Sequence, residues 1–164
     1  MTADRLTITA LGDQEIVIRR AFAAPRALVF EALTTPALLQ RWLFGPADWT
    51  FPICEVDLRV GGRYRYVWEK PKTGHRMEMT GVYQEIVPPE RLVTTESFDD
   101  DWTKGAAVAT LVLTEKDGVT TMINTIRYSS REARDAVLQS PMELGLVEGY
   151  ARLDGLLKGR SGRT

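Results

Sequence analysis

The sequence predicts an α+β domain: a curved antiparallel sheet of about six to seven strands wrapped around a long C-terminal helix, with two short helices after the first strand. Three observations indicate this class. Six alternating segments, separated by short polar turns, follow one another between residues 51 and 128. Helical patterns opened by proline lie on both sides of them. The length of 164 residues suits one domain, so we expect residues 1–164 to fold as a single unit.

The N-terminal part is predicted to contain one strand and two helices. Residues 6–22 form a long extended pattern with a kink near Gly12. Pro25 opens the first helix, because proline suits the first helical turn. Thr35 can cap a second, shorter helix that ends near Trp42, and a proline directly follows this cap.

Six strands are expected in the central part of the chain. They span residues 51–58, 63–69, 76–87, 92–98, 106–114 and 119–128. Residues 115–118 end in Asp-Gly, which is typical of a tight hairpin between the last two strands. Because side chains alternate between the faces of a strand, Tyr64, Tyr66 and Trp68 share one face. Three large rings in a row indicate the lining of a cavity, with a core packed under the last helix as the alternative.

Two helices are predicted at the C-terminal end. Residues 129–132 form a capping-box pattern with Ser129 as the cap, and we expect this helix to end near Leu138. Residues 140–158 form the last and longest helix, opened by serine, proline and glutamate in the cap, first and third positions. Residues 159–164 are predicted to be a disordered tail.

Four motifs, in this order, resemble one known family. They are LQRWLFGP at residues 39–46, DLRVGG at 57–62, GVYQEIVPPERL at 81–92 and MELGLVEGYARLDGLL at 142–157. The family is related to the activator of the heat-shock chaperone ATPase, within the START-like (SRPBCC) superfamily that includes the major birch-pollen allergen. The resemblance covers about residues 16–157 and implies a helix-grip fold with a cavity between sheet and long helix. It implies no single activity, because relatives include lipid carriers, aromatase/cyclases and a chaperone activator.

The predicted function is the binding of a small hydrophobic or aromatic molecule in this cavity. Rings and methionines at alternate strand positions, together with one tyrosine of the last helix, are expected to line it. These residues are Tyr64, Tyr66, Trp68, Met77, Met79, Met122 and Tyr150. Two further residues, Trp42 and Trp49, are predicted to guard its entrance.

A metal-independent cyclase, isomerase or hydrolase is the alternative function, with Glu96 and Tyr66 as its acid–base groups. A carboxyl inside the cavity would have a raised pKa, as general acids and bases require. The favoured prediction for Glu96 is instead an outward side chain or a partner of Arg63 or Arg65, so the sequence favours a binding protein over an enzyme. Asn124 lies on the more apolar face of its strand, and local satisfaction of its amide is favoured over contact with a ligand.

Composition and spacing exclude several other classes. A net charge of −1 gives no attraction for nucleic acid, and no apolar run reaches the roughly 20 residues of a membrane span. The only histidine, His75, and the only cysteine, Cys54, lie far apart, and Asp99 to Asp101 do not match a calcium loop, so no metal or cofactor is expected. One cysteine and no signal peptide predict a cytoplasmic protein. A homodimer and a stress-related chaperone accessory stay open, although the chain has no room for the activators' separate docking domain.

Overall fold

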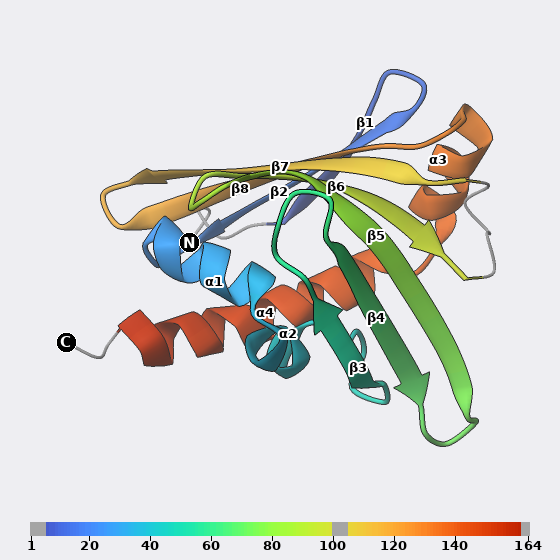
Figure 1. Ribbon diagram of the computed structural model, residues 1–164, viewed down its shortest axis with the longest axis horizontal. Helices are drawn as coiled ribbons and strands as arrows, with labels where there is room; N and C mark the ends of the chain where they lie inside the picture. The colour runs from blue at the N-terminus through green and yellow to red at the C-terminus, as the bar shows by residue number, and fades with distance from the viewer. Residues whose placement is uncertain (1–5, 100–104, 162–164) are drawn as a thin grey trace.

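The structure, a computed structural model, describes residues 6–99 and 105–161 of the chain. In these residues it contains eight strands and four helices (Figure 1). The strands are β1 (Thr7–Leu11), β2 (Glu15–Phe22), β3 (Thr50–Val56), β4 (Arg63–Lys70), β5 (His75–Val87), β6 (Arg91–Phe98), β7 (Ala107–Lys116) and β8 (Val119–Arg127). The helices are α1 (Arg26–Thr34), α2 (Pro36–Trp42), α3 (Arg131–Gln139) and α4 (Met142–Ser161). The predicted α+β class is confirmed.

All of these strands join one antiparallel sheet in the order β1-β2-β8-β7-β6-β5-β4-β3. Strands β3 to β8 follow one another as the predicted meander, and β2 pairs with β8. The predicted count of six to seven strands is too low. Gly12 adopts a φ of +56° and reverses the chain, so Leu11 pairs with Glu15. The expected kinked strand at residues 6–22 is therefore a hairpin.

Helix ends differ in detail from the predictions. Thr35 occupies the N-cap position of α2 as predicted, but its side chain makes no capping hydrogen bond. The cap of α3 is Ser130 rather than Ser129, and its hydroxyl accepts a hydrogen bond from the backbone N–H of Ala133 at 3.1 Å. The predicted hairpin between β7 and β8 is present, and both Asp117 and Gly118 have the positive φ that a tight two-residue turn requires.

Helix α4 crosses the face toward which the sheet curls at β3, β4 and β5 (Figure 1). Helices α1 and α2 lie on the same side of the sheet and pack against α4. Leu153 and Leu157 of α4 are buried in the core, at 0% and 2% exposure. The helix continues to Ser161, so residues 159–161 of the predicted tail are helical, and residues 162–164 lie outside the described part of the chain.

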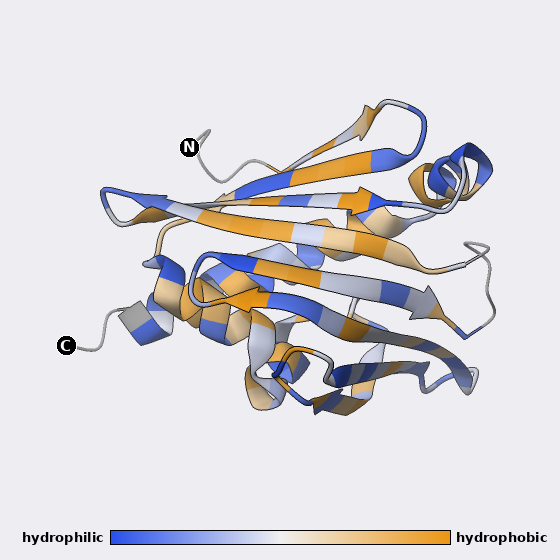
Figure 2. Cartoon of the chain, turned by 45° about the horizontal axis from the view of Figure 1, so that its top comes forward, coloured by the Kyte–Doolittle hydropathy of each residue, from blue (hydrophilic) through white to orange (hydrophobic). Residues whose placement is uncertain are grey.

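Polar and apolar residues alternate along several strands (Figure 2). In β4 the rings of Tyr64, Tyr66 and Trp68 are buried, whereas Arg63 is exposed and Arg65 is half-buried. This pattern confirms the predicted inner face of the strand. The curled sheet thus directs a row of rings toward the helices.

Two arginines fix the helices to the first hairpin. Arg20 of β2 donates two hydrogen bonds to the carboxylate of Asp154 in α4, at 2.8 and 2.6 Å, and its guanidinium lies 4.9 Å from the ring centre of Phe22. Arg134 of α3 donates to the backbone carbonyls of Gly12 and Glu15, at 2.9 and 3.1 Å. Both side chains are buried, so these contacts replace the water that their charges would otherwise bind.

Candidate functional site: a cavity between the sheet and the last helix

A cavity of about 550 Å³ lies between the inner face of the sheet and α4. Small-ligand pockets are typically about 300–1,000 Å³, so the volume suits a small molecule. Every residue predicted from the sequence to line the cavity or guard its entrance borders it: Trp42, Trp49, Tyr64, Tyr66, Trp68, Met77, Met79, Met122 and Tyr150. That they bind a ligand stays a prediction.

The rings of β4 and β5 form a continuous aromatic wall. The ring centres of Tyr64 and Tyr66 are 4.7 Å apart, and those of Tyr66 and Trp68 are 5.8 Å apart with the rings edge to face. Tyr83 joins them at 5.7 Å from Tyr64. The indole N–H of Trp68 donates to the backbone carbonyl of Leu43 at 2.7 Å, so this ring borders the cavity without an unpaired donor. Mutual packing therefore holds the wall in one shape.

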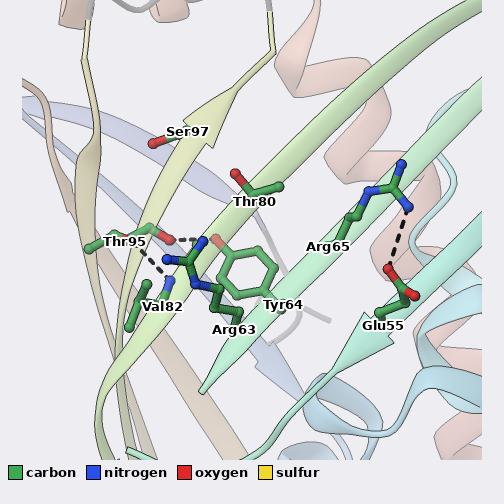
Figure 3. A pocket seen from close by; sticks show the side chains of 9 residues that line it. Glu55, Arg63, Tyr64, Arg65, Thr80, Val82, Thr95 and Ser97 are labelled. Atoms are coloured by element: carbon green, nitrogen blue, oxygen red, sulfur yellow. Dashed lines mark hydrogen bonds and ion pairs between the residues drawn. The ribbon is translucent and has the colours of Figure 1, made fainter. Parts of the chain in front are cut away.

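The hydroxyl of Tyr64 is held by the backbone. It donates to the carbonyl of Thr95 at 2.5 Å, where the missing side chain of Gly81 leaves room for the ring. Tyr64 also borders a polar depression on the opposite face of β4 to β6 (Figure 3). Arg65 in that depression forms ion pairs with Glu55, at 3.4 Å, and with Glu78. The Tyr64 hydroxyl is therefore hydrogen-bonded within the sheet, whereas its ring borders the cavity.

Trp42 lies in the wall of the cavity and not at the entrance that the sequence predicted. It is 2% exposed, its indole N–H donates to the carbonyl of Ala32 at 3.0 Å, and its ring stacks on Tyr150 at 5.9 Å. The helix that carries it faces inward, so the bulky side chain is buried. The prediction of a guarding role for Trp42 is wrong.

Among the described residues that border the cavity, His75 and Pro141 are the two exposed ones, so the cavity reaches the surface there, and the loop between α2 and β3 lies beside this entrance. Trp49 of this loop is partly exposed and meets the ring of His75 edge to face at 5.7 Å. His75 is exposed, as predicted, but it also borders the cavity. Phe44 lies under the guanidinium of Arg152, 3.7 Å from the ring centre. Met142, at the start of α4, borders the opening from the other side.

Glu96 points into the cavity, so the prediction of an outward side chain is wrong. Strand alternation places it on the same face of β6 as Thr94 and Phe98, which also border the cavity. The arginines proposed as its partners, Arg63 and Arg65, belong to the opposite face. Among the described residues no hydrogen bond or ion pair reaches its carboxyl group, and burial raises its pKa to about 7.

Four tyrosines lie within electrostatic range of Glu96. Burial raises the pKa values of Tyr64, Tyr66, Tyr128 and Tyr150, and the charge of Glu96 raises each of them further. These phenols come from β4, from the residue after β8 and from α4. They stay protonated at neutral pH, so the interior combines one carboxyl group with several aromatic hydroxyls.

Asn124 is the second polar residue of the cavity wall with a side-chain atom that has no hydrogen-bond partner among the described residues. It follows Met122 on the inner face of β8 and precedes Ile126 and Tyr128, as the alternation predicts. Its side-chain oxygen is buried and accepts no hydrogen bond from any described residue. The prediction that the protein satisfies this amide locally is wrong. A buried amide oxygen without a hydrogen-bond partner costs free energy, and this one belongs to a residue that borders the cavity.

Sequence reasoning missed several other residues that border the cavity. Strand parity could have found them, because each shares a face with a residue already predicted or opposes one in the sheet. They include Tyr83, Thr94, Phe98, Ala109 and Leu111.

The described part of the chain contains no cluster of three or more histidine, cysteine or carboxylate side chains that could hold a metal ion. Asp99 accepts the backbone N–H of Glu78 with its carboxylate at 3.3 Å, as expected of a turn residue. Asp100 and Asp101 lie outside the described residues. No helix in those residues has the length and apolar content that crossing a bilayer requires.

A curled antiparallel sheet that encloses an apolar cavity against a long C-terminal helix defines a helix-grip protein. The family model described as "Activator of Hsp90 ATPase homolog 1-like protein" matches residues 23–158. The chain therefore belongs to this family, and the predicted resemblance is confirmed. No curated protein matches the chain.

Solved structures with the same fold are similar over nearly the whole chain. A crystal structure of a protein from Rhodobacter sphaeroides has 35% sequence identity and a TM-score of 0.87, and the match covers 94% of this chain and 99% of the other. Protein CV1439 from Chromobacterium violaceum has 26% identity and a TM-score of 0.77, with coverage of 88% and 96%. An AHSA1-like protein from Aeromonas hydrophila, at 20% identity, has a TM-score of 0.70 with coverage of 87% and 93% and shows the fold alone.

Proposed function

We propose that this protein binds a small hydrophobic or aromatic molecule in the cavity between the sheet and α4. The observation that carries the proposal is a preformed space of about 550 Å³ walled by packed rings. Apolar burial contributes about 25 cal/mol per Å², and walls that are already ordered lose little entropy on binding. Methionines at the entrance side, Met77 and Met142, can adapt to ligands of different outline.

Filling the cavity is expected to weaken binding without unfolding the protein. Ala109 borders the cavity from β7, so Ala109→Trp places an indole inside it. With N-phenyl-1-naphthylamine as a neutral fluorescent probe, we expect an affinity at least about tenfold weaker than that of the natural protein, because the indole displaces several buried carbons worth about 0.8 kcal/mol each. Fluorescence titration measures this change.

The matched control is Thr110→Trp, since the adjacent residue of β7 belongs to the other face of the strand. This variant should bind the probe as the natural protein does. Circular dichroism and thermal unfolding check that both variants are folded, and Leu111→Trp offers a second way to fill the cavity. Equal binding by all of these proteins, or no binding by any, would contradict the proposal. Native mass spectrometry of gently purified protein would identify bound cargo and distinguish a monomer from a homodimer.

A metal-independent enzyme of the cyclase, isomerase or hydrolase type is the second candidate function. The observation that favours it is the carboxyl group of Glu96 inside the cavity, with a pKa of about 7, in electrostatic range of Tyr66. Burial keeps the pKa of Tyr66 well above its ordinary value, so this phenol would donate a proton or hydrogen bond and Glu96 would accept one.

For the hydrolase form of this candidate, turnover of a neutral aryl ester such as p-nitrophenyl acetate should rise with pH through about 7 as Glu96 ionises. Glu96→Gln should remove this rise, and Tyr66→Phe should lower the rate while keeping the pH midpoint. Initial rates between pH 5 and 9 measure both effects. A rate that is unchanged in Glu96→Gln would exclude this carboxyl group as the base.

A further inference from the structure

We infer that the cavity selects an apolar or aromatic molecule that carries a protonated amine, with Glu96 as its counter-ion. The inference rests on the proposed binding function and names the class of ligand. The charged side chains in the cavity walls support it. Among the described lining residues, Glu96 is the one carboxylate, and no lysine or arginine borders the space. His75 borders it only at the exposed entrance.

Cations close to the cavity are already neutralised by partners of their own. The guanidinium of Arg20 lies 6.0 Å from the ring centre of Tyr150 and donates to both carboxylate oxygens of Asp154. Arg152 lies over Phe44 and pairs with Glu148 at 3.6 Å. Neither guanidinium borders the interior. The charge that a ligand meets inside is therefore that of Glu96.

The surroundings of Glu96 suit an ammonium group. Rings of Tyr64, Tyr66, Tyr128 and Tyr150 border the same cavity, and the negative π-face of an aromatic ring attracts a cation. Removing a carboxylate from water without giving it a partner costs free energy. An ammonium group that donates to Glu96 would offset this cost with a charge-assisted hydrogen bond. An anionic ligand, such as a fatty acid, would meet a like charge and no compensating cation.

Asn124 provides a second polar contact at some distance from Glu96. In the sheet register Glu96 is opposite Ala107, whereas Asn124 is opposite Leu111, four residues further along β7. At about 3.3 Å per residue, the two polar groups are separated by roughly 13 Å along the strand direction. A ligand that reaches both would carry its amine at one end and a hydroxyl or amide near the other.

Binding of the amine is expected to release the proton that Glu96 holds. The titratable groups that border the cavity with this carboxyl group are the tyrosines of β4, β5 and α4 and Tyr128, which stay protonated at neutral pH. The exposed His75 borders the cavity at its entrance. Because burial raises the pKa of Glu96 to about 7, affinity for a cation should rise between pH 6 and 8. Affinity for a neutral molecule should not rise.

Three probes with one ring system test this inference. They are 1-naphthylmethylamine, 1-naphthalenemethanol and 1-naphthoic acid, which are cationic, neutral and anionic at pH 8. By isothermal titration calorimetry, we expect the amine to bind about tenfold or more tightly than the alcohol and the acid to bind most weakly. Glu96→Gln should reduce the amine to the affinity of the alcohol and leave the alcohol unchanged. Glu90→Gln, on the exposed β5–β6 turn, is the matched control and should keep the preference.

The outcomes separate this inference from the proposed function. An acid that binds as tightly as the amine, or an amine preference that survives in Glu96→Gln, overturns the inference and leaves hydrophobic binding intact. An affinity for the amine that does not change between pH 6 and 8 in the natural protein also overturns it. If none of the three probes binds, the proposed function itself is contradicted.

Discussion

Glu96→Gln is expected to stabilise the protein by about 2–3 kcal/mol at pH 8, an unusual result for a substitution in the interior of a domain. Burial raises the pKa of this carboxyl group from 4.5 to about 7. At pH 8 the folded protein therefore holds a negative charge in the cavity wall, on a half-buried side chain without a described partner. Glutamine has nearly the same shape and no charge. Glu96 is half-buried rather than fully buried, so solvent screens part of the penalty and the expected gain stays below the full value of the pKa shift.

The sign of the pH dependence follows from the raised pKa. Between pH 4.5 and 7 the folded state keeps a proton that the unfolded state loses, so stability falls as the pH rises through this window. Below pH 4.5 both states hold the proton, and Glu96 then costs nothing relative to glutamine. The stability difference between the two proteins should therefore be small at pH 4.5 and reach its full value near pH 8.

Urea unfolding at pH 4.5, 6 and 8 measures this difference, with m-values compared to check that unfolding stays two-state. Glu90→Gln removes an exposed carboxylate on the β5–β6 turn and should change stability by less than about 0.5 kcal/mol throughout. If the free energy of unfolding changes with pH by the same amount in Glu96→Gln and in the natural protein, Glu96 does not titrate inside the fold in this range.

A side chain that is expected to lower stability at physiological pH is informative about function. Costly polar groups cluster at sites that a ligand or reaction uses, and the buried polar residues of the described sheet, Arg20 and Thr120, have hydrogen-bond partners within the protein. Glu96 and the unsatisfied oxygen of Asn124 both border the same cavity. The structure of the protein alone explains neither, whereas a bound molecule with hydrogen-bond donors would satisfy both.

Local patterns in the sequence predicted most of the fold. Alternation identified β3 to β8, and proline and serine located the starts of α2 and α4 to within a residue or two. The first hairpin was missed because residues 6–22 are apolar on both sides of Gly12, and only its positive φ distinguishes a reversal from a kink.

The direction of polar side chains was harder to predict than the strands that carry them. In β6, Thr94 and Glu96 share a face with Leu92 and Phe98, while the other face is also mixed, so periodicity does not tell which side is inner. A charged residue is by default expected outside, and that default failed for Glu96. Trp42 was misplaced for the opposite reason, since its helix packs on two sides and the sequence does not show which side meets solvent.

Gly81→Ala is expected to destabilise the protein by about 3 kcal/mol or more, among the largest effects of any single methyl group added to this chain. A Cβ atom at this position would lie 1.9 Å from the carbonyl oxygen of Thr95 and 2.3 Å from a ring carbon of Tyr64. These two residues, Tyr64 and Thr95, form the hydrogen bond that holds the aromatic wall in place. Urea unfolding at pH 7 measures the loss, and Gly155→Ala is the control. Gly155 has open space around it in α4, so alanine there should add up to about 1 kcal/mol of stability.

The two clashes at Gly81 make different predictions for a double variant. A ring can move or be removed, whereas the Thr95 carbonyl belongs to the backbone of a paired strand. If the ring contact dominated, Gly81→Ala combined with Tyr64→Ala would be no less stable than Tyr64→Ala alone. Because the shorter contact is with the backbone, we expect Gly81→Ala to cost stability in both backgrounds. A loss of cavity binding should accompany it, since β5 can relieve the backbone clash only by moving away from β6 and opening the wall at Tyr64. A Gly81→Ala protein with normal stability and normal probe affinity would contradict the close approach on which the shape of this cavity depends.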